Sequence, residues 1–316
     1  MICCLFLFAC SSSPTPSALE NWMAENQKLK VLSTTAMIDD LVGEIGKDRV
    51  DHLTLIIGDI DPHSYELLKG DDEKMHFAEI VFFNGLGLEH GASLRYLLSQ
   101  HPFAVAVGEE IQKACPSRIL WVDDQIDPHV WMDISLWVES VDAIVGALSK
   151  KDLEGAPFYR KNGELLKQRM WNAHKTILDK LSVISPEKKF LVTSHDAFNY
   201  FARTYLAPAE EVEKGEWKER FKAPEGLAPE GQLSVSDIQK IIRHVQEHHI
   251  QVVFPESNVS RDSLKKIVQV CAQKEMGIKL CTSVLYGDAM GPTGSDADSY
   301  LKMMEHNAEV LFHAWK

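Results

Sequence analysis

The sequence predicts an α/β protein with two lobes, each a mostly parallel sheet flanked by helices, joined by one long helix. In both halves, short apolar runs alternate with amphipathic helical segments. The runs are continuously apolar, which is typical of buried parallel strands. One uninterrupted helical pattern separates the halves, and 316 residues are enough for two domains of ordinary size. We therefore expect lobes at residues 29–155 and 187–316, joined by a helix at 156–186.

The first half gives the alternation most clearly. Its apolar runs are bounded by Gly or by polar turns, as expected for strands in a buried sheet. Strands are expected at the start of 28–46 and in 50–58, 78–85 and 103–108, and helices at the end of 28–46 and in 64–77, 89–100 and 134–150.

The joining helix is predicted from one apolar stripe with steps of three and four residues. Pro157 suits its first turn, and Pro186 follows its end. At the helical rise its length is about 40 Å, enough to connect two lobes. The stripe consists of Leu166, Met170, Ala173, Ile177, Leu181 and Ile184.

The second half repeats the strand and helix alternation after this helix. Residues 209–232 interrupt it with a charged stretch punctuated by Gly and Pro, which predicts irregular structure. Strands are expected in 188–194, 250–256 and 277–283, and helices in 196–206, 234–249, 261–275 and 295–315.

Composition excludes some functions. The chain is 45% hydrophobic and 25% charged, with a formal net charge of −13, so it is a globular protein that is poorly suited to bind nucleic acid. The sequence contains no C-x-x-C pair, which excludes a thiolate zinc knuckle. Cys271 and Cys281 could form a disulfide in an oxidising compartment or remain two free thiols.

The N-terminus predicts export. Residues 1–10 are apolar but too short to span a bilayer, and a Ser/Pro-rich stretch follows Cys10. This pattern resembles a bacterial lipoprotein signal with Cys10 as the lipidated residue, although the usual basic start is missing. An ordinary secretory signal or a misassigned start is the alternative. In each case residues 1–28 are expected to be signal and tether, and the protein to be periplasmic or extracytoplasmic, with a lipid anchor if Cys10 is modified.

Four potential metal ligands follow predicted strands. In open α/β sheets, ligands bind beyond the carboxyl ends of the strands. A proline precedes two of the histidines and restricts the backbone there. Three imidazoles and one carboxylate suit Zn²⁺, Mn²⁺ or Fe²⁺ and lack the sulfur that Cu(I) prefers. The four residues are His63, His129, His195 and Asp288.

Nearby carboxylates could orient the imidazole rings. Asp61, Asp127 and Glu66 are candidates to accept ring N–H groups. Glu256 also follows a predicted strand, but we expect it to be a polar loop residue outside the site. Proton competition at such a site predicts that affinity falls below about pH 6, the ordinary range of histidine.

The motifs together resemble a known family. In order, they are DPHSYE, NGLGLE, DPHVWMD, TSHDAFNYFA and YGDAMG with SYLKMMEHN. Over residues 29–316 they are similar to the metal-binding proteins of ABC importers for zinc, manganese and iron, the TroA-like, cluster A-I solute-binding proteins.

The resemblance implies two lobes joined by a single rigid helix, with one ion buried between them. The ligands it carries over are His63, His129, His195 and Asp288, and the implied partner is an ABC membrane permease that a monomer would serve. The zinc-uptake branch often has a His-rich loop after the first ligand, and none is present here.

Other functions were weighed against transport. A metal hydrolase could use the three histidines with Asp288 or Glu66 as general base. However, four protein ligands fill a coordination shell, whereas catalytic zinc keeps one position open for water. A lipid-anchored adhesin is a third alternative, and it would not need His195.

Two short motifs are treated as chance matches. HVQEH at His244–His248 matches the H-x-x-E-H of zinc proteases, but its helix has an apolar stripe that leaves both histidines facing solvent. Gly85–Gly91 is one residue too long for the dinucleotide-binding pattern G-x-G-x-x-G.

Overall fold

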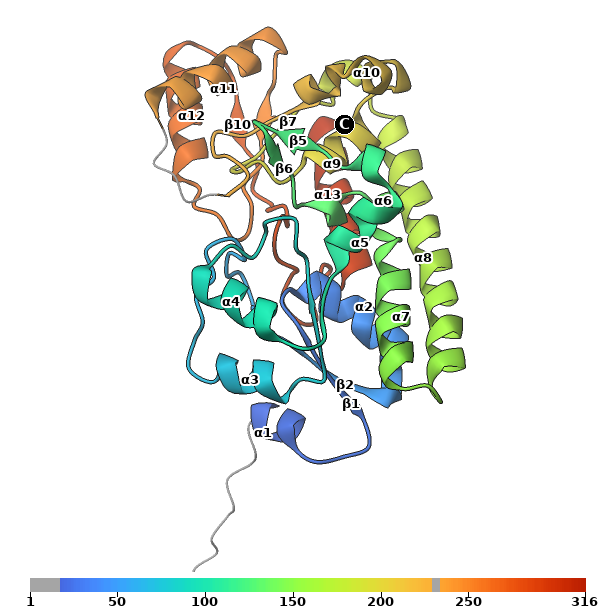
Figure 1. Ribbon diagram of the computed structural model, residues 1–316. Helices are drawn as coiled ribbons and strands as arrows, with labels where there is room; N and C mark the ends of the chain where they lie inside the picture. Colours follow the sequence, from blue (N-terminus) through green and yellow to red (C-terminus); the bar gives the residue numbers. More distant parts are fainter. Residues whose placement is uncertain (1–17, 229–233) are drawn as a thin grey trace, which may run out of the picture.

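A computed structural model describes residues 18–228 and 234–316 (Figure 1). The N-terminal lobe contains a four-stranded parallel sheet in the order β2-β1-β3-β4. Because parallel strands need crossovers, helices connect them and cover the sheet. The strands are β1 (Leu29–Ser33), β2 (Val50–Thr54), β3 (Ile80–Phe83) and β4 (Ala104–Ala106); the helices are α2 (Ala36–Gly46), α3 (Asp71–Phe77), α4 (Ala92–Gln100), α5 (Val107–Ala114), α6 (Ile134–Trp137) and α7 (Ser140–Lys151).

Helix α8 (Ala156–Ser182) runs along one side of the molecule (Figure 1). Its 27 residues correspond to a length of about 40 Å. The predicted stripe is buried from Leu166 to Leu181, and it packs on α7, α2, α6 and α13 (Tyr300–Trp315). At Gly163 a Cβ would lie 2.7 Å from the Val145 side chain, so this position lets α7 and α8 approach closely.

The C-terminal lobe has shorter strands. Parallel pairs form between β7 (Leu191–Val192) and β8 (Phe221–Lys222), and between β9 (Val252–Val253) and β10 (Lys279–Leu280). The Phe254 N–H donates to the Val192 carbonyl at 2.8 Å, which connects the two pairs side by side. The helices are α9 (Asn199–Phe201), α10 (Ala209–Lys214), α11 (Val235–Glu247), α12 (Asp262–Gln273) and α13. The predicted α/β class is confirmed.

Several segments differ from the sequence prediction. The helix expected over 64–77 begins only at Asp71, because Asp71 Oδ2 accepts hydrogen bonds from the Leu68 N–H and the Tyr65 hydroxyl and so closes the preceding turn. Residues 121–126 form an antiparallel hairpin of β5 (Trp121–Val122) and β6 (Gln125–Ile126). The segment expected to be irregular contains α10, a 3-10 helix at Glu216–Arg220 and β8.

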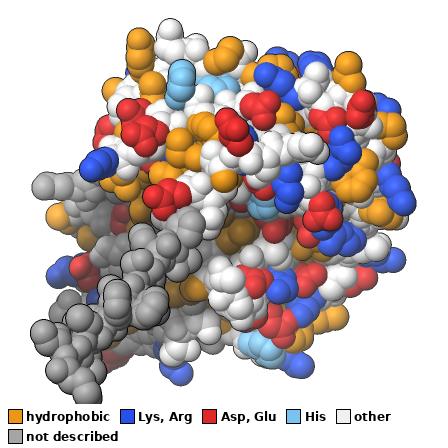
Figure 2. Space-filling view, turned by 90° about the horizontal axis from the view of Figure 1, so that it is seen from below, with side chains coloured by type: hydrophobic (Ala, Val, Ile, Leu, Met, Phe, Trp, Pro, Cys, Tyr) orange, Lys and Arg blue, Asp and Glu red, His pale blue; other side chains and the backbone are white. Residues whose placement is uncertain are grey.

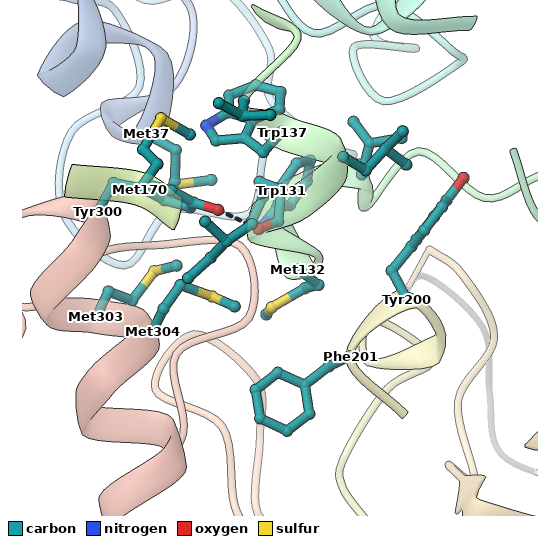
Figure 3. Close-up of a cluster of buried hydrophobic side chains, with 14 of the residues drawn as sticks. Met37, Trp131, Met132, Trp137, Met170, Tyr200, Phe201, Tyr300, Met303 and Met304 are labelled. Atoms are coloured by element: carbon teal, nitrogen blue, oxygen red, sulfur yellow. Dashed lines mark hydrogen bonds between the residues drawn. The ribbon is translucent and has the colours of Figure 1, made fainter. Parts of the chain in front are cut away.

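A cluster of large buried side chains includes Trp131 (Figure 3), whose ring contacts that of His129. Trp131 and Trp137 are in edge-to-face contact with ring centroids 6.5 Å apart, and the Tyr300 hydroxyl donates to the Trp131 carbonyl at 2.7 Å. Tyr300 begins α13, whereas Trp131 precedes α6. This cluster therefore fixes a loop of the N-terminal half against the last helix of the chain.

One helix precedes the first strand in the described part of the chain. Helix α1 (Ala18–Met23) packs on the lobe through Trp22, which is buried, lies 5.5 Å from the Phe77 ring centroid and donates to the Asp51 carbonyl. The predicted tether at 1–28 is therefore not a free segment from Ala18 onwards. Cys10 and the rest of the predicted signal lie outside the described residues.

Three further features bear on the sequence predictions. Cys115, Cys271 and Cys281 are free thiols, so the possible disulfide is not formed. Among the described residues, no helix combines the length and apolar character needed to cross a membrane. The face in Figure 2 mixes acidic with basic side chains and does not concentrate positive charge, in keeping with the negative net charge.

Candidate metal centre

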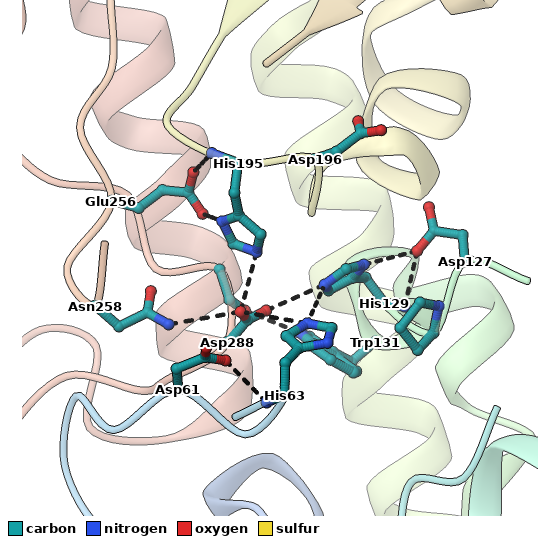
Figure 4. Close-up of polar contacts among 12 residues, drawn as sticks. Asp61, His63, Asp127, His129, Trp131, His195, Asp196, Glu256, Asn258 and Asp288 are labelled. Carbon is teal, nitrogen blue, oxygen red and sulfur yellow. Dashed lines mark hydrogen bonds and ion pairs between the residues drawn. The ribbon is translucent and has the colours of Figure 1, made fainter. Parts of the chain in front are cut away.

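The four predicted ligands converge at one buried point (Figure 4). Nε2 of His63 lies 3.1 Å from Nε2 of His129, and 3.8 Å from a carboxylate oxygen of Asp288. The Asp288 carboxylate lies 3.4 Å from Nε2 of His129 and 3.0 Å from Nε2 of His195. Ligands at zinc distances on a tetrahedron are about 3.3 Å from each other, so these separations fit one shared ion.

His129 is held by its own turn. Asp127, two residues earlier, contacts Nδ1 of His129 at 2.7 Å and accepts the His129 N–H at 3.0 Å through the same oxygen. The carbonyl of Pro128 accepts a hydrogen bond from the Asn84 side chain, and the Tyr200 hydroxyl donates to the Asp127 carbonyl. The ring is therefore turned so that Nε2 faces the other ligands.

His195 is held by a residue from another strand. It follows β7, and Nδ1 of His195 lies 2.7 Å from Oε2 of Glu256, which follows β9. The other Glu256 oxygen accepts the N–H groups of Ser194 and His195, each at 2.9 Å. Glu256 is 1% exposed. The expectation that it is a loop residue outside the site was therefore wrong.

Asp288 comes from the loop between β10 and α13. The Trp131 ring N–H donates to the Gly287 carbonyl at 2.9 Å, which ties this loop to the segment after His129. At Gly287 a Cβ would lie 2.5 Å from Oε2 of Glu256, so a side chain there would displace the carboxylate that orients His195. The Asn258 side chain is the nearest neutral partner of Asp288, at 3.5 Å.

His63 differs from His129 and His195 because, among the described residues, no carboxylate contacts the outer nitrogen of its ring. Asp61 accepts the His63 backbone N–H at 2.8 Å and the Ser64 hydroxyl, not the imidazole N–H. Glu66 accepts from the Ser93 hydroxyl on the exterior. Of the three carboxylates predicted to orient rings, only Asp127 does so. His63 is also the ligand that lines a cleft of about 620 Å³ with Trp121 and Pro128, which offers an approach to the site.

The buried ionisable groups of the site strongly shift each other's pKa values. Burial alone would raise the pKa of Asp288, but His195 and His129 hold it well below its ordinary value. Burial opposes protonation of His129, yet the carboxylates of Asp127 and Asp288 raise its pKa to about 9. Burial lowers the pKa of His63 to about 3, against the attraction of Asp288. Burial also opposes protonation of His195, but Glu256 and Asp288 raise its pKa well above the ordinary value, so the site stabilises positive charge at two of its three imidazoles.

These residues are suited to bind a cation. Three neutral imidazoles and one carboxylate give a borderline donor set for divalent first-row metals. At the centre, Oδ1 of Asp288 and Nε2 of His195 are buried and make no hydrogen bond, and their polar contacts are the ion-pair separations between the ligands themselves. A bound ion would satisfy both, since it accepts lone pairs from all four side chains at once.

The structure brings the predicted ligands together, but not from four equivalent positions. His195 follows β7 closely, whereas His129 follows the antiparallel β5–β6 hairpin and not a strand of the parallel sheet. His63 lies nine residues beyond β2, and Asp288 eight beyond β10. The repeated Asp-Pro-His motif identified His63 and His129, and the place after a predicted strand identified His195. No local sequence signal pairs Glu256 with His195.

The two histidines of the HVQEH motif, which was treated as a chance match, are more buried than the sequence predicted. His244 is 5% exposed and does not face solvent, and His248 is half-buried.

The Gly85–Gly91 loop is closed by Glu89, whose carboxylate accepts the N–H groups of Asn84 and Gly85.

Comparison with known proteins agrees with the fold and the site. The family model described as zinc-uptake complex component A, periplasmic, matches residues 31–314. The chain is 35% identical over 308 residues to the metal-binding protein YtgA of Chlamydia muridarum, covering 98% of this chain and 90% of the relative. It is 30% identical over 312 residues to the manganese-binding lipoprotein MntA of Bacillus subtilis, covering 98% and 96%.

Solved structures with a similar fold are also those of metal-binding proteins. Fe(III)-bound YtgA from Chlamydia trachomatis superimposes with a TM-score of 0.86 at 35% identity, covering 91% of this chain and 98% of that chain. The periplasmic zinc-binding protein TroA from Treponema pallidum gives 0.82 at 26% identity, covering 91% and 99%.

The chain is thus a solute-binding protein of the type that serves metal importers. It belongs to the ZnuA family of zinc-uptake components. The family resemblance predicted from the motifs is confirmed. Because family members are transport components and not enzymes, the hydrolase alternative is not supported.

Proposed function

We propose that the protein captures one divalent transition-metal ion outside the cytoplasmic membrane and delivers it to an ABC permease. His63 and His129 from the first half and His195 and Asp288 from the second would bind the ion. The observation that carries this proposal is the convergence of these four buried side chains, with one ligand atom from each within 4.8 Å of all the others. No bond is made or broken, since four protein ligands leave no open position for a reacting water.

Zn²⁺, Mn²⁺ and iron are the candidate cargoes. Relatives are named for each of them: YtgA was crystallised with Fe(III), MntA is a manganese-binding lipoprotein and TroA is a zinc-binding protein. The donor set suits all three, and Zn²⁺ outbinds the other two at most such sites by the Irving–Williams order. Affinity alone therefore does not identify the physiological ion, and elemental analysis of protein from its native host does.

The proposed organisation has lobes at 29–155 and 187–316, joined by the segment 156–186, in which α8 is helical over Ala156–Ser182. A continuous helix resists bending, so release would need only a modest change between lobes. Cys10 would carry a lipid anchor, as in the relatives called lipoproteins, and the protein would act as a monomer.

Calorimetric titration tests the proposal. Metal-free protein is titrated with Zn²⁺ and Mn²⁺ beside Asp288→Asn, which keeps the shape of the ligand but removes its charge. The proposal predicts tight binding of one ion that is lost in the variant. Unchanged binding in Asp288→Asn would refute the site, and hydrolysis of an ester or peptide that requires His129 would refute the function.

A further inference from the structure

A second group of metal-binding side chains lies in the C-terminal lobe. Glu219 is in the 3-10 helix before β8, and His244 and His248 lie on and at the end of α11. One ligand atom from each of the three lies within 4.8 Å of the others. Within the described residues, this is the one such group besides the four-residue centre.

The group shares no residue with that centre. Phe190, which stacks on His248 with ring centroids 4.1 Å apart, immediately precedes β7, whereas His195 follows β7. His248 therefore contacts the residue before β7, whereas the ligand His195 comes after this strand. The inference does not depend on the proposed function.

The two imidazoles are placed by the helix. Residues four apart lie on the same face of a helix, one turn from each other. The ring centroids of His244 and His248 are 4.6 Å apart, and Nδ1 of His244 lies 3.8 Å from Oε2 of Glu219. The separation of Nδ1 from Oε2 is too long for a hydrogen bond, and ligand atoms of all three side chains lie close enough together to bind one ion.

His244 has the character of a ligand. It is 5% exposed, and its Nε2 has no hydrogen-bond partner. Burial, together with the nearby His248 and Lys222, lowers the pKa of His244 to about 4, so its ring is neutral at physiological pH. A neutral imidazole has a lone pair to donate to a metal.

Lys222 carries a positive charge that repels a metal ion bound by these three side chains. Its ammonium lies 3.1 Å from Oε1 of Glu219, whereas the other carboxylate oxygen faces His244. The two Glu219 oxygens can therefore serve Lys222 and an ion at the same time. The repulsion between Lys222 and the ion lowers the affinity of the site but does not prevent binding.

We propose that Glu219, His244 and His248 form an accessory site for a divalent transition-metal ion such as Zn²⁺. Two imidazoles and one carboxylate are a donor set that zinc accepts, and water completes the shell because the group is partly exposed. The accessory site is weaker than the four-ligand centre and fills when the metal is abundant. It makes the protein bind two ions per chain in excess zinc.

The test counts bound ions. Untagged, metal-free protein is titrated calorimetrically with ZnCl₂ beside His248→Gln, Asp288→Asn and the double variant. We expect two ions in the unchanged protein, one in each single variant and none in the double variant. One ion in the unchanged protein, or two in His248→Gln, would overturn the accessory site. Loss in His248→Gln with no loss in Asp288→Asn would refute the main centre and keep this site.

Two further variants separate ligation from structure. His249 is exposed and adjacent, with φ of 51°, so His249→Asn removes a neighbouring imidazole with little backbone cost and should retain both ions. Lys222→Gln should tighten the weaker site by up to about fivefold, as the loss of an exposed like charge allows. Circular dichroism checks that each variant is folded. Loss of the second ion in His249→Asn, or no tightening in Lys222→Gln, would contradict the assignment.

Discussion

The two halves of the metal centre orient their histidines in different ways. In the first half, Asp127 and His129 belong to one turn and are two residues apart, so the orienting contact is local. In the second half, His195 depends on Glu256, which is 61 residues later and follows another strand. The first arrangement needs only a correct turn, whereas the second needs a correctly assembled lobe. The difference predicts that the same chemical change has different consequences in each half.

The largest effects are expected at the ligands themselves. His129→Ala and His195→Ala should each weaken metal binding by more than the 10–100-fold that is typical of losing an orienting partner. Equal losses would mean that both halves hold the ion. Calorimetric titration measures the change, with His313→Ala as a control because His313 is exposed at the end of α13. Retained affinity in either ligand variant would mean that one half binds alone.

The orienting carboxylates should give intermediate effects. Asp127→Ala and Glu256→Ala are each expected to weaken binding by about 10–100-fold. They should differ in stability, since Glu256 accepts two buried N–H groups and Asp127 accepts one. Each orphaned group costs about 1–3 kcal/mol, so Glu256→Ala should lower the free energy of unfolding more. Chemical denaturation of the metal-free variants measures this, and equal losses would remove the distinction between local and distant support.

The pH dependence sharpens the comparison at Asp127. Asp127 and Asp288 raise the pKa of His129 to about 9 against the effect of burial, so in the metal-free protein this ring carries a proton at neutral pH. A metal must displace that proton and also the proton of His195, whose pKa Glu256 and Asp288 raise well above its ordinary value against burial, so affinity should rise by about a hundredfold per pH unit up to about pH 9. This moves the decline well above the value near pH 6 expected from sequence.

Asp127→Asn should alter that profile in a defined direction. Without the Asp127 charge the pKa of His129 falls, and the metal competes with fewer protons at neutral pH. The affinity lost in the variant should therefore be smaller at pH 7 than at pH 9. Titrations at both values test this, and a loss that is constant with pH would contradict the role of Asp127.

The smallest effect is expected at the contact between the halves. Trp131→Phe removes the hydrogen bond from the indole N–H to the Gly287 carbonyl and keeps most of the packing. A hydrogen bond contributes about 0.5–1.5 kcal/mol, so metal release should accelerate by up to about tenfold. Stopped-flow chelation measures the rate. An unchanged rate would show that the Asp288 loop holds its place without Trp131.

The difference between local and distant contacts also explains which features the sequence could predict. Local signals were sufficient for the helix α8, whose stripe from Leu166 to Leu181 is buried, and for the Asp-Pro-His turns. They also identified Asp127, because its contact with His129 lies within one turn. Glu256 was missed because its contact with His195 exists only when β7 and β9 lie side by side. His244 was expected in solvent because the helix periodicity does not show that the 3-10 helix at Glu216–Arg220 and Phe190 cover it.

The central claim is that one ion is bound jointly by both halves. A crystal structure of the metal-loaded protein, with data at the absorption edge of the bound metal, tests this most directly. The account predicts one anomalous peak within bonding distance of Nε2 of His63, His129 and His195 and of the Asp288 carboxylate. A strong peak that contacts ligands from only one half, or that lies away from these four side chains, would contradict it.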